Sequence, residues 1–376
     1  MKLKIFILIV LGISSQTIIA QNELKIIRAN SITADIRDGK TLRKGYWRIV
    51  PETNPDIYTT SAKKVTFYTD IDSISFDIKP NQHYDFIILL NEKDSARTRI
   101  VWEPSKLEIL RRGSEYNRSD NRFIPEFKYQ SQDNPNLVKT RETLKLDSIA
   151  GKGSELSRIF NLLHWVHNMV RHDGSSNNPE KKNAIDLLAV CRTENRGINC
   201  RMMAMVLNEC YLAMGIKSRY VTCMPRETKF NDCHVINMVY STELNKWIWI
   251  DPTFDAYVMD DKGNLLGIQE VRERLIKGQP LILNADANWN RMNLQTKDHY
   301  LEYYMAKNLY RLQVPLISDY NTETCEKGKE IAFVELLPLD GIEQNPQKRE
   351  YNDSETGMKY VYYKTNNPDL FWKKPE

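Results

Sequence analysis

Residues 197–200 read Gly-Ile-Asn-Cys, and they open a helical segment that the following residues continue. Apolar side chains recur after them at intervals of three or four residues: Met203, Leu207, Cys210 and Met214. Gly215 is a typical helix stop, so the pattern predicts a helix that begins near Asn199. Cys200 therefore lies in the first turn of this helix.

A cysteine in the first turn of a helix is well placed to act as a nucleophile. The positive end of the helix dipole favours the thiolate over the thiol. The backbone N–H groups of this turn have no partner inside the helix, so they can hold an oxyanion. We expect Gly197 to let the chain turn sharply into the helix. A buried structural thiol is nevertheless the commoner explanation of Cys200 taken by itself.

A predicted hairpin supplies two partners for this thiol. Its strands cover residues 232–240 and 246–251. If residues 241–244 form the whole connection, His234 lies directly opposite Asp251. A carboxylate beside an imidazole fixes its tautomer and stabilises its charged form, as a cysteine–histidine couple requires. An incidental cross-strand pair is the alternative, and a register slip of one residue would separate the two side chains.

Four stretches around these residues follow a recognisable pattern. They are Gly-Ile-Asn-Cys-Arg-Met-Met-Ala at 197–204, Gly-Ile-Lys-Ser-Arg-Tyr-Val at 215–221, Asp-Cys-His-Val-Ile-Asn-Met-Val at 232–239 and Trp-Ile-Trp-Ile-Asp-Pro-Thr at 247–253. In this order they resemble the transglutaminase-like superfamily, and the flanking regions look like those of exported bacterial members. The resemblance implies a papain-like core and acyl transfer from an amide through a thioester. It also implies Cys200 as nucleophile, His234 as its base and Asp251 as the group that orients the base.

Two positions depart from the family pattern. Eukaryotic cross-linking members have Trp after the nucleophile, where this chain has Arg201, and many relatives have Ala and Trp after the histidine, where it has Val235. The fate of the thioester therefore stays open. Peptide or amide hydrolysis is the favoured outcome. The alternatives are protein-glutamine gamma-glutamyltransferase activity, by cross-linking or amine incorporation, and a non-catalytic binding or scaffold module.

The order of elements predicts an α+β fold, with a papain-like core behind an N-terminal β-sandwich. Apolar and polar residues alternate at 64–69 and 73–78, as expected for short strands. The predicted domains are residues 1–20 as a signal peptide, 21–130 as a β-sandwich, 131–260 as the catalytic core and 261–376 as a C-terminal extension packed on the core. The polar stretch 113–136 is expected to be a linker or surface excursion, and residues 299–312 a helix.

The first twenty residues have the pattern of a secretory signal. Lys2 and Lys4 precede an apolar run from Ile5 to Ile13, and Ala20 offers a cleavage point. We therefore expect an exported protein, periplasmic or extracellular, with no membrane span after signal removal. An uncleaved anchor is the alternative, although the apolar run is short for a bilayer.

Composition limits the class of partner. The formal net charge is +4, and no clustered basic surface is evident in the sequence, so nucleic acid is not an expected partner. We expect a protein or peptide substrate, with a cell-wall peptide as one candidate, and no cofactor.

Asn199, Arg201 and Trp249 are the candidates for substrate contact, because they flank the nucleophile or share a strand side with Asp251. Arg219 is expected to form a structural salt bridge.

His164 and His167, with His172 after them, could suggest a metal site. Their spacing is not the usual i, i+4 pair, and no acidic partner is placed with them. Helix-surface or capping roles are expected, and no metal.

Overall fold

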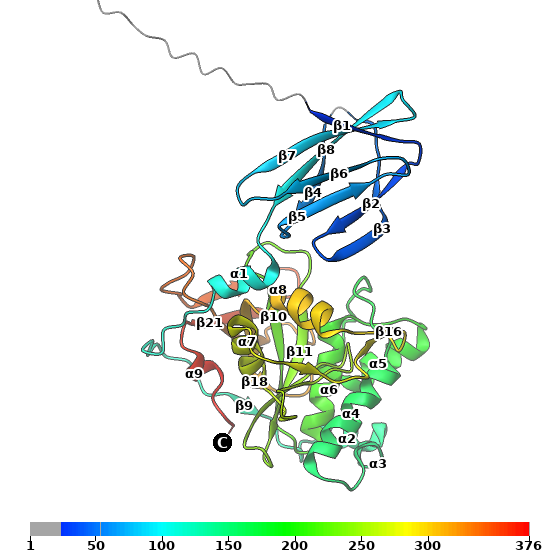
Figure 1. Cartoon of the computed structure of the whole chain (residues 1–376). Helices are drawn as coiled ribbons and strands as arrows, with labels where there is room; N and C mark the ends of the chain where they lie inside the picture. The colour runs from blue at the N-terminus through cyan, green and yellow to red at the C-terminus, as the bar shows by residue number, and fades with distance from the viewer. Residues whose placement is uncertain (1–23, 53, 376) are drawn as a thin grey trace, which may run out of the picture. The chain divides into compact units, whose positions relative to one another are not determined.

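Two units make up the described part of the chain, residues 24–52 and 54–375 of the computed structural model (Figure 1). They divide between Pro104 and Ser105, which is earlier than the predicted boundary at residue 130. The predicted signal peptide, residues 1–20, lies outside the described residues.

The first unit is a β-sandwich, as predicted. Its strands are β1 (Lys25–Ala29), β2 (Thr33–Asp38), β3 (Thr41–Arg48), β4 (Asp56–Thr60), β5 (Lys64–Tyr68), β6 (Ser73–Asp77), β7 (His83–Leu90) and β8 (Asp94–Trp102). They form two four-stranded sheets, in the orders β1-β7-β8-β4 and β3-β2-β5-β6. In β6 every second side chain is buried, because one face of the strand is apolar. Phe67 of one sheet packs on Phe86 of the other, with ring centroids 5.0 Å apart.

The second unit is built around a seven-stranded sheet, which confirms the mixed α and β class. Its strands are β10 (Ser218–Met224), β11 (His234–Ser241), β12 (Lys246–Ile250), β17 (Arg311–Pro315), β19 (Glu330–Leu336), β20 (Arg349–Asn352) and β21 (Lys359–Thr365). They lie in the order β12-β11-β10-β17-β19-β21-β20, with β19 and β21 parallel. Residues 261–376 therefore supply four strands of the central sheet and are more than the predicted extension packed on the core.

Two-residue strands complete the unit: β9 (Lys128–Tyr129), β13 (Val258–Met259), β14 (Ile282–Leu283), β15 (Asn288–Trp289), β16 (Asn293–Leu294) and β18 (Ile317–Ser318). Of these, β15 and β16 form a short antiparallel hairpin that bears on the site described below.

Helices cover both faces of the seven-stranded sheet. One layer holds α2 (Pro135–Leu144), α3 (Leu146–Ala150), α4 (Glu155–Met169), α5 (Ala184–Thr193) and α6 (Cys200–Ala213). The other holds α1 (Lys106–Arg112), α7 (Ile268–Lys277), the π-helix η1 (Asp298–Met305), α8 (Ala306–Asn308) and α9 (Pro368–Phe371). Val235 and Val239 of β11 belong to the first core and Ile236 and Met238 to the second, since side chains alternate along a strand. No helix in the described part of the chain is long and apolar enough to cross a membrane.

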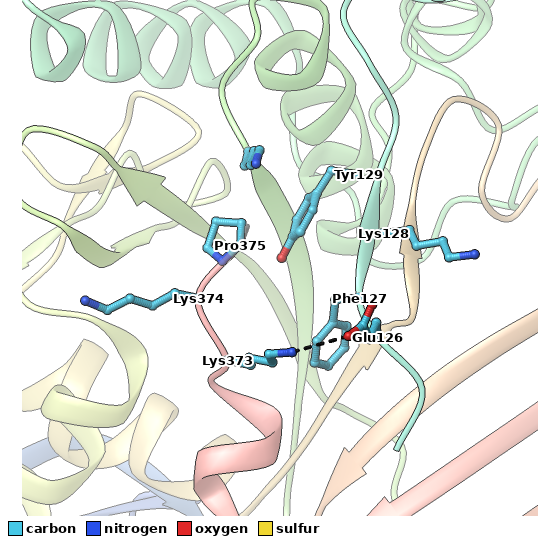
Figure 2. A pocket seen from close by; sticks show the side chains of 8 residues that line it. Glu126, Phe127, Lys128, Tyr129, Lys373, Lys374 and Pro375 are labelled. Atoms are coloured by element: carbon cyan, nitrogen blue, oxygen red, sulfur yellow. Dashed lines mark ion pairs between the residues drawn. The ribbon is translucent and has the colours of Figure 1, made fainter. Parts of the chain in front are cut away.

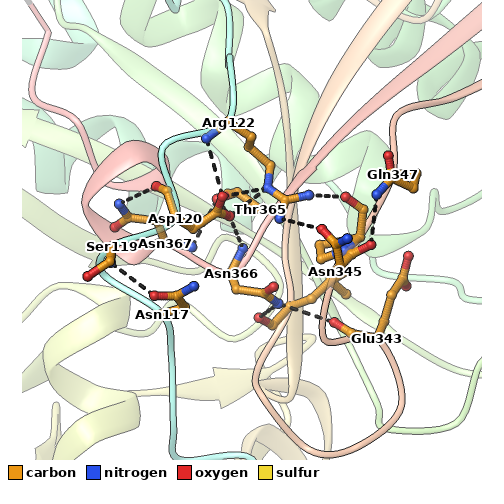
Figure 3. Close-up of polar contacts among 12 residues, drawn as sticks. Asn117, Ser119, Asp120, Arg122, Glu343, Asn345, Gln347, Thr365, Asn366 and Asn367 are labelled. Atoms are coloured by element: carbon orange, nitrogen blue, oxygen red, sulfur yellow. Dashed lines mark hydrogen bonds and ion pairs between the residues drawn. The ribbon is translucent and has the colours of Figure 1, made fainter.

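A buried aspartate ties the stretch predicted as a linker to the second unit (Figure 3). Asp120 Oδ2 accepts hydrogen bonds from Thr365 Oγ1 (2.9 Å) and from the backbone N–H of Asn366 (3.0 Å). The same oxygen lies 2.6 Å from Nε of Arg122. These contacts join residues before β9 to the end of β21, which explains why the units divide before this stretch.

Candidate active site

Helix α6 begins at Cys200, and Asn199 caps it. The Asn199 side chain accepts a hydrogen bond from the N–H of Met202 (3.1 Å) and donates one to Asn178 Oδ1 (2.7 Å). Such a cap satisfies one of the free donors of the first turn and stabilises the helix start. The Asn199 side chain therefore caps the helix, and its contact with a substrate stays a prediction.

Gly197 allows another segment of the chain to approach the helix start closely. Residues 171–173 pair with this region: Ile198 N–H donates to the Arg171 carbonyl (3.1 Å), and Asp173 N–H donates to the Ile198 carbonyl (2.9 Å). A Cβ on Gly197 would lie 2.3 Å from the Arg171 carbonyl oxygen. The glycine is needed for this approach, and not for the sharp turn suggested by the sequence.

The hairpin of β11 and β12 brings His234 and Asp251 together, but in a different register from the predicted one. Ser241 pairs with Lys246, so the strands are offset by two residues and His234 is not directly opposite Asp251. Asn245 has a left-handed φ of 51° and belongs to the turn. An offset of two residues keeps each side chain on its own face of the sheet. Asp251 Oδ2 therefore still accepts a hydrogen bond from His234 Nε2, over 2.7 Å.

The Asp251 carboxylate is fully buried, and three groups donate hydrogen bonds to it. Besides His234, the Tyr300 hydroxyl donates to Oδ2 (2.6 Å) and the Thr253 N–H to Oδ1 (2.9 Å). Trp249 Nε1–H donates in turn to the Tyr300 hydroxyl oxygen (3.2 Å). Trp249 is fully buried, so the predicted contact between this ring and a substrate is wrong. Its place is behind the aspartate, where it orients Tyr300.

Three hydrogen-bonding groups act on the Cys200 sulfur. The side chains of His172 and His234 bond to it, and the backbone N–H of Val235 also donates to it. Burial by itself raises the pKa of the Cys200 thiol, but these hydrogen bonds and the charge of His234 lower it to about 6. Cys200 is therefore mostly thiolate at neutral pH.

His234 uses its two ring nitrogens for different partners. Nε2 bonds to Asp251, and the ring also interacts with the Cys200 sulfur. Nδ1 has no oxygen or nitrogen partner among the described residues, so it is the ring nitrogen that we assign to the sulfur. Burial favours the neutral ring, but Asp251 and Cys200 raise the pKa of His234 to about 10. Near neutral pH the couple is thus a thiolate and an imidazolium. The rings of Phe254 and Tyr304 hold the imidazole, with centroids 5.5 and 5.2 Å from it.

Arg201 follows Cys200, and its side chain extends toward the sheet. Its guanidinium pairs with Glu323 (Nη1 to Oε1, 2.5 Å) and donates to Thr222 Oγ1 (2.8 Å). The Tyr220 hydroxyl donates to the same Glu323 oxygen (2.7 Å). These bonds fix Arg201 between α6 and β10, so the structure gives this side chain a structural role in place of the predicted substrate contact.

His172 is the residue of this site that the sequence did not identify. Its segment pairs with Ile198, and this places the ring beside Cys200. Its Nδ1 accepts a hydrogen bond from Trp289 Nε1, over 3.1 Å. Nothing in the local pattern links His172 and Trp289 to Cys200, because all three are distant from one another along the chain.

The other two histidines considered as metal ligands are engaged in hydrogen bonds. His164 Nδ1 lies 2.7 Å from both carboxylate oxygens of Asp255, and this bond raises the pKa of His164. Ligand atoms of these two residues and of Asp286 lie within 4.8 Å of one another. His167 Nδ1 lies 3.0 Å from the Pro252 carbonyl oxygen, and His167 Nε2 lies 3.0 Å from Asn288 Oδ1. Hydrogen bonding accounts for both rings, and we assign no metal to them.

A charged cavity of about 390 Å³ lies at the end of β10, next to residues of β17, β19, β20 and β21. Its charged lining carries both signs: Arg311, Arg349, Lys364, Glu335 and Glu343. Cys200, His234 and Asp251 do not line this cavity.

A second cavity, of about 340 Å³, lies at the opposite end of β10 (Figure 2). Lysines 217, 373 and 374 line it, together with Tyr129. Arg219 lies nearby, fully buried, with its guanidinium 3.9 Å from the ring centroid of Phe127. No carboxylate in the described part of the chain pairs with Arg219 within 4.0 Å, so the predicted salt bridge is wrong and ring stacking takes its place. This cavity is not part of the thiol site.

Comparison with known proteins connects this geometry to a family. Residues 142–252 match the Transglutaminase-like superfamily. Among solved structures, the chain is similar to a candidate cysteine protease from Cytophaga hutchinsonii, with 23% identity over 31% of this chain and 37% of that chain and a TM-score of 0.25. It is also similar to red sea bream transglutaminase, with 11% identity over 61% of this chain and 49% of that chain and a TM-score of 0.23. The chain thus spans less than half the length of either protein.

No curated protein matches the chain. Members of the superfamily are generally cysteine-dependent enzymes. Residues 142–252, which include Cys200, His234 and Asp251, form a transglutaminase-like domain.

Proposed function

We propose that this chain is an exported thiol enzyme that hydrolyses amide bonds in a protein or peptide substrate. One observation carries the proposal: the Cys200 sulfur, at the start of α6, is hydrogen-bonded by two histidines, and buried Asp251 holds one of them. This arrangement lowers the pKa of the thiol. Burial alone does the opposite, as it does at Cys210 on the same helix, where it raises the pKa of the thiol.

The proposed reaction begins when the Cys200 thiolate attacks the carbonyl carbon of the amide. A sulfur–carbon bond forms, and the negative charge moves to the carbonyl oxygen, which the N–H of Cys200 stabilises at the helix start. The His234 imidazolium gives its Nδ1 proton to the amide nitrogen, the carbon–nitrogen bond breaks, and the amine leaves. A thioester remains on Cys200.

Water completes the cycle. Neutral His234 takes a proton from a water molecule as the water oxygen attacks the thioester carbon. The carbon–sulfur bond breaks, the carboxylic acid leaves, and the thiolate and imidazolium are restored. Asp251 stays ionised throughout and keeps the His234 ring oriented. We favour water as the acceptor because it requires no second binding site for an amine.

The substrate class that we propose is a protein or peptide outside the cytoplasm, with a cell-wall peptide as one candidate.

Thiol labelling tests whether the site is catalytic. Iodoacetamide at neutral pH should alkylate Cys200 much faster than the other cysteines, because the thiolate is the reactive form. Cys200→Ala should remove the fast labelling while leaving the thermal unfolding of the protein unchanged, and Cys325→Ala, at an exposed thiol, should retain it. Equally slow labelling of all cysteines would contradict the proposal and favour a binding or scaffold module.

The acceptor of the acyl group needs a separate experiment. The protein is mixed with a Gln-containing peptide and a labelled primary amine, and released ammonia and incorporated amine are both measured. Ammonia release without incorporation supports hydrolysis. Incorporation that outpaces hydrolysis identifies a transglutaminase and overturns our choice of water.

Export is proposed from the N-terminal sequence. Cleavage after Ala20 would give a mature protein that begins at Gln21. The N-terminal sequence of protein recovered from outside the cytoplasm tests this, and an intact Met1 there would overturn it.

A further inference from the structure

The hairpin of β15 and β16 clamps the backbone of His172. The His172 N–H donates to Asn290 Oδ1 (2.7 Å), and Asn290 Nδ2 donates back to the His172 carbonyl (3.0 Å). On its other side, His172 bridges to Ile198, two residues before the nucleophile. The backbone of His172 is therefore fixed from both sides, by two segments distant in sequence.

Trp289 determines which nitrogen of this ring carries the proton. Its indole N–H lies 3.1 Å from His172 Nδ1, and an indole N–H can only donate. Nδ1 must therefore accept, and the single proton of the neutral ring lies on Nε2. Since Nδ1 is occupied, the hydrogen bond between His172 and the Cys200 sulfur is made by Nε2. His172 is then a donor to sulfur and cannot act as a base in this tautomer.

We propose that His172 is a second catalytic histidine, which donates its Nε2–H first to the Cys200 thiolate and then to the oxyanion, and that Trp289 is the positioning residue that keeps this proton on Nε2. The hydrogen bond from His172 changes its acceptor from sulfur to oxygen because the attack moves the negative charge. When the sulfur–carbon bond forms, the negative charge leaves the sulfur and appears on the oxygen bonded to the same carbon. A donor fixed beside the sulfur is then close to the new charge. The two histidines have different roles: His234 transfers a proton, whereas His172 donates a hydrogen bond and retains its proton.

The oxyanion part of this inference rests on the proposed function, whereas the thiolate part does not. Besides the two histidines, the titratable groups that act on the Cys200 sulfur are Cys233, Cys223 and Tyr304. Burial raises the pKa of all three of these groups, so they are neutral over the range in which Cys200 ionises. A shift in the ionisation of Cys200 after a change at His172 can therefore be assigned to the lost hydrogen bond.

The first test measures the rate of alkylation by iodoacetamide between pH 4 and 9. In His172→Ala the sulfur loses a donor, and the midpoint of the rate profile should rise by about one pH unit. His172→Gln keeps an N–H donor and should shift the midpoint less. His299→Gln, at an exposed histidine outside the site, is the matched control and should leave the midpoint unchanged. An unshifted midpoint in His172→Ala would overturn the proposal.

The second test separates Trp289 from a merely structural role, and it also serves if His172→Ala does not fold. Trp289→Phe keeps an aromatic ring but removes the N–H, so His172 can move its proton to Nδ1 or gain a second proton. The turnover of an amide substrate should fall roughly tenfold, and its pH profile should gain an ionisation between pH 5 and 7. Wild-type turnover and an unchanged pH profile would overturn the role of Trp289.

The outcomes also separate this inference from the proposed function. If Cys200 is not labelled rapidly in the wild-type protein, the proposed function as a thiol enzyme is wrong. If Cys200 is labelled rapidly and the His172 and Trp289 variants behave like wild type, only the proposed role of His172 is wrong.

Discussion

The site that we propose combines side chains from three separate parts of the chain. The helix start supplies the thiol, β11 supplies His234, and the segment before α5 supplies His172. The sequence could predict the first two, because each lies in a short pattern of its own. It could not predict His172, because only the pairing of residues 171–173 with the helix start brings that ring to the sulfur.

The pH dependence of the thiol is the first prediction at this scale. Because the pKa of Cys200 is lowered to about 6, its alkylation rate should reach half of its plateau near pH 6 and stay high above it. Turnover should rise through the same pH as the thiolate forms. It should fall again as the pH approaches 10, where His234 loses the proton that the leaving amine needs. A labelling midpoint near pH 8.5, the value of an ordinary thiol, would contradict this.

A second prediction concerns the hydroxyl behind Asp251. Tyr300→Phe removes a donor to the carboxylate and leaves the Trp249 N–H without its acceptor. We expect kcat/KM to fall about tenfold, since a hydrogen bond to a charged group typically contributes that much. Tyr303→Phe, at an exposed tyrosine of the same helix, should have wild-type kcat/KM. Equal kinetics for the two variants would show that Tyr300 does not orient the triad.

At the scale of elements, periodicity predicted strands and helices better than it predicted their ends and partners. The helix predicted for residues 299–312 is instead η1 and α8, followed by β17, which begins at Arg311. The change from helix to strand there is imposed by pairing with β10 and β19, and neither partner is nearby in sequence. The hairpin register was missed for a more local reason, since Asn245 takes a turn conformation that a count of loop residues does not reveal.

The close approach at Gly197 gives a prediction at this scale. Gly197→Ala would place a methyl group against the Arg171 carbonyl, which is backbone and cannot move aside as a side chain could. We expect the free energy of unfolding to fall by about 1–3 kcal/mol and the alkylation of Cys200 to slow, because the helix start is displaced. Gly174→Ala is the matched control, since its Cβ would meet only His172 Cε1 at 3.6 Å. Thermal unfolding of both variants measures the difference, and equal melting temperatures would contradict the argument.

At the scale of the whole molecule, the second unit is closed by contacts between its two ends. Residues before β9 bind residues at the end of β21 through Asp120 (Figure 3). The last four strands of the central sheet come from beyond residue 260, although the family pattern stops at residue 252. The boundaries predicted at residues 130 and 260 followed changes in local composition. Neither coincides with the division between the two compact units, which lies between Pro104 and Ser105.

Asp120 gives the prediction at this scale. Asp120→Ala leaves the buried Thr365 hydroxyl and the Asn366 N–H without an acceptor and removes the partner of Arg122. We expect the free energy of unfolding of the second unit to fall by about 3 kcal/mol or more. Asp369→Ala breaks an exposed pair with Arg118 and should cost less than about 1 kcal/mol. Denaturant unfolding compares the two, and a small loss for Asp120→Ala would show that the stretch is a linker after all.

The sequence by itself indicated many of the strands and helices and three residues of the proposed site. Helix starts, alternation along strands and the family pattern all depend on residues within a few positions of one another, so they can be recognised without a structure. The tertiary structure alone decided the strand order, the hairpin register, the roles of Arg201 and Trp249, and the place of His172. These depend on which faces meet, and the residues concerned are tens to hundreds of positions apart. Packing of the whole chain brings them together, and no local pattern records it.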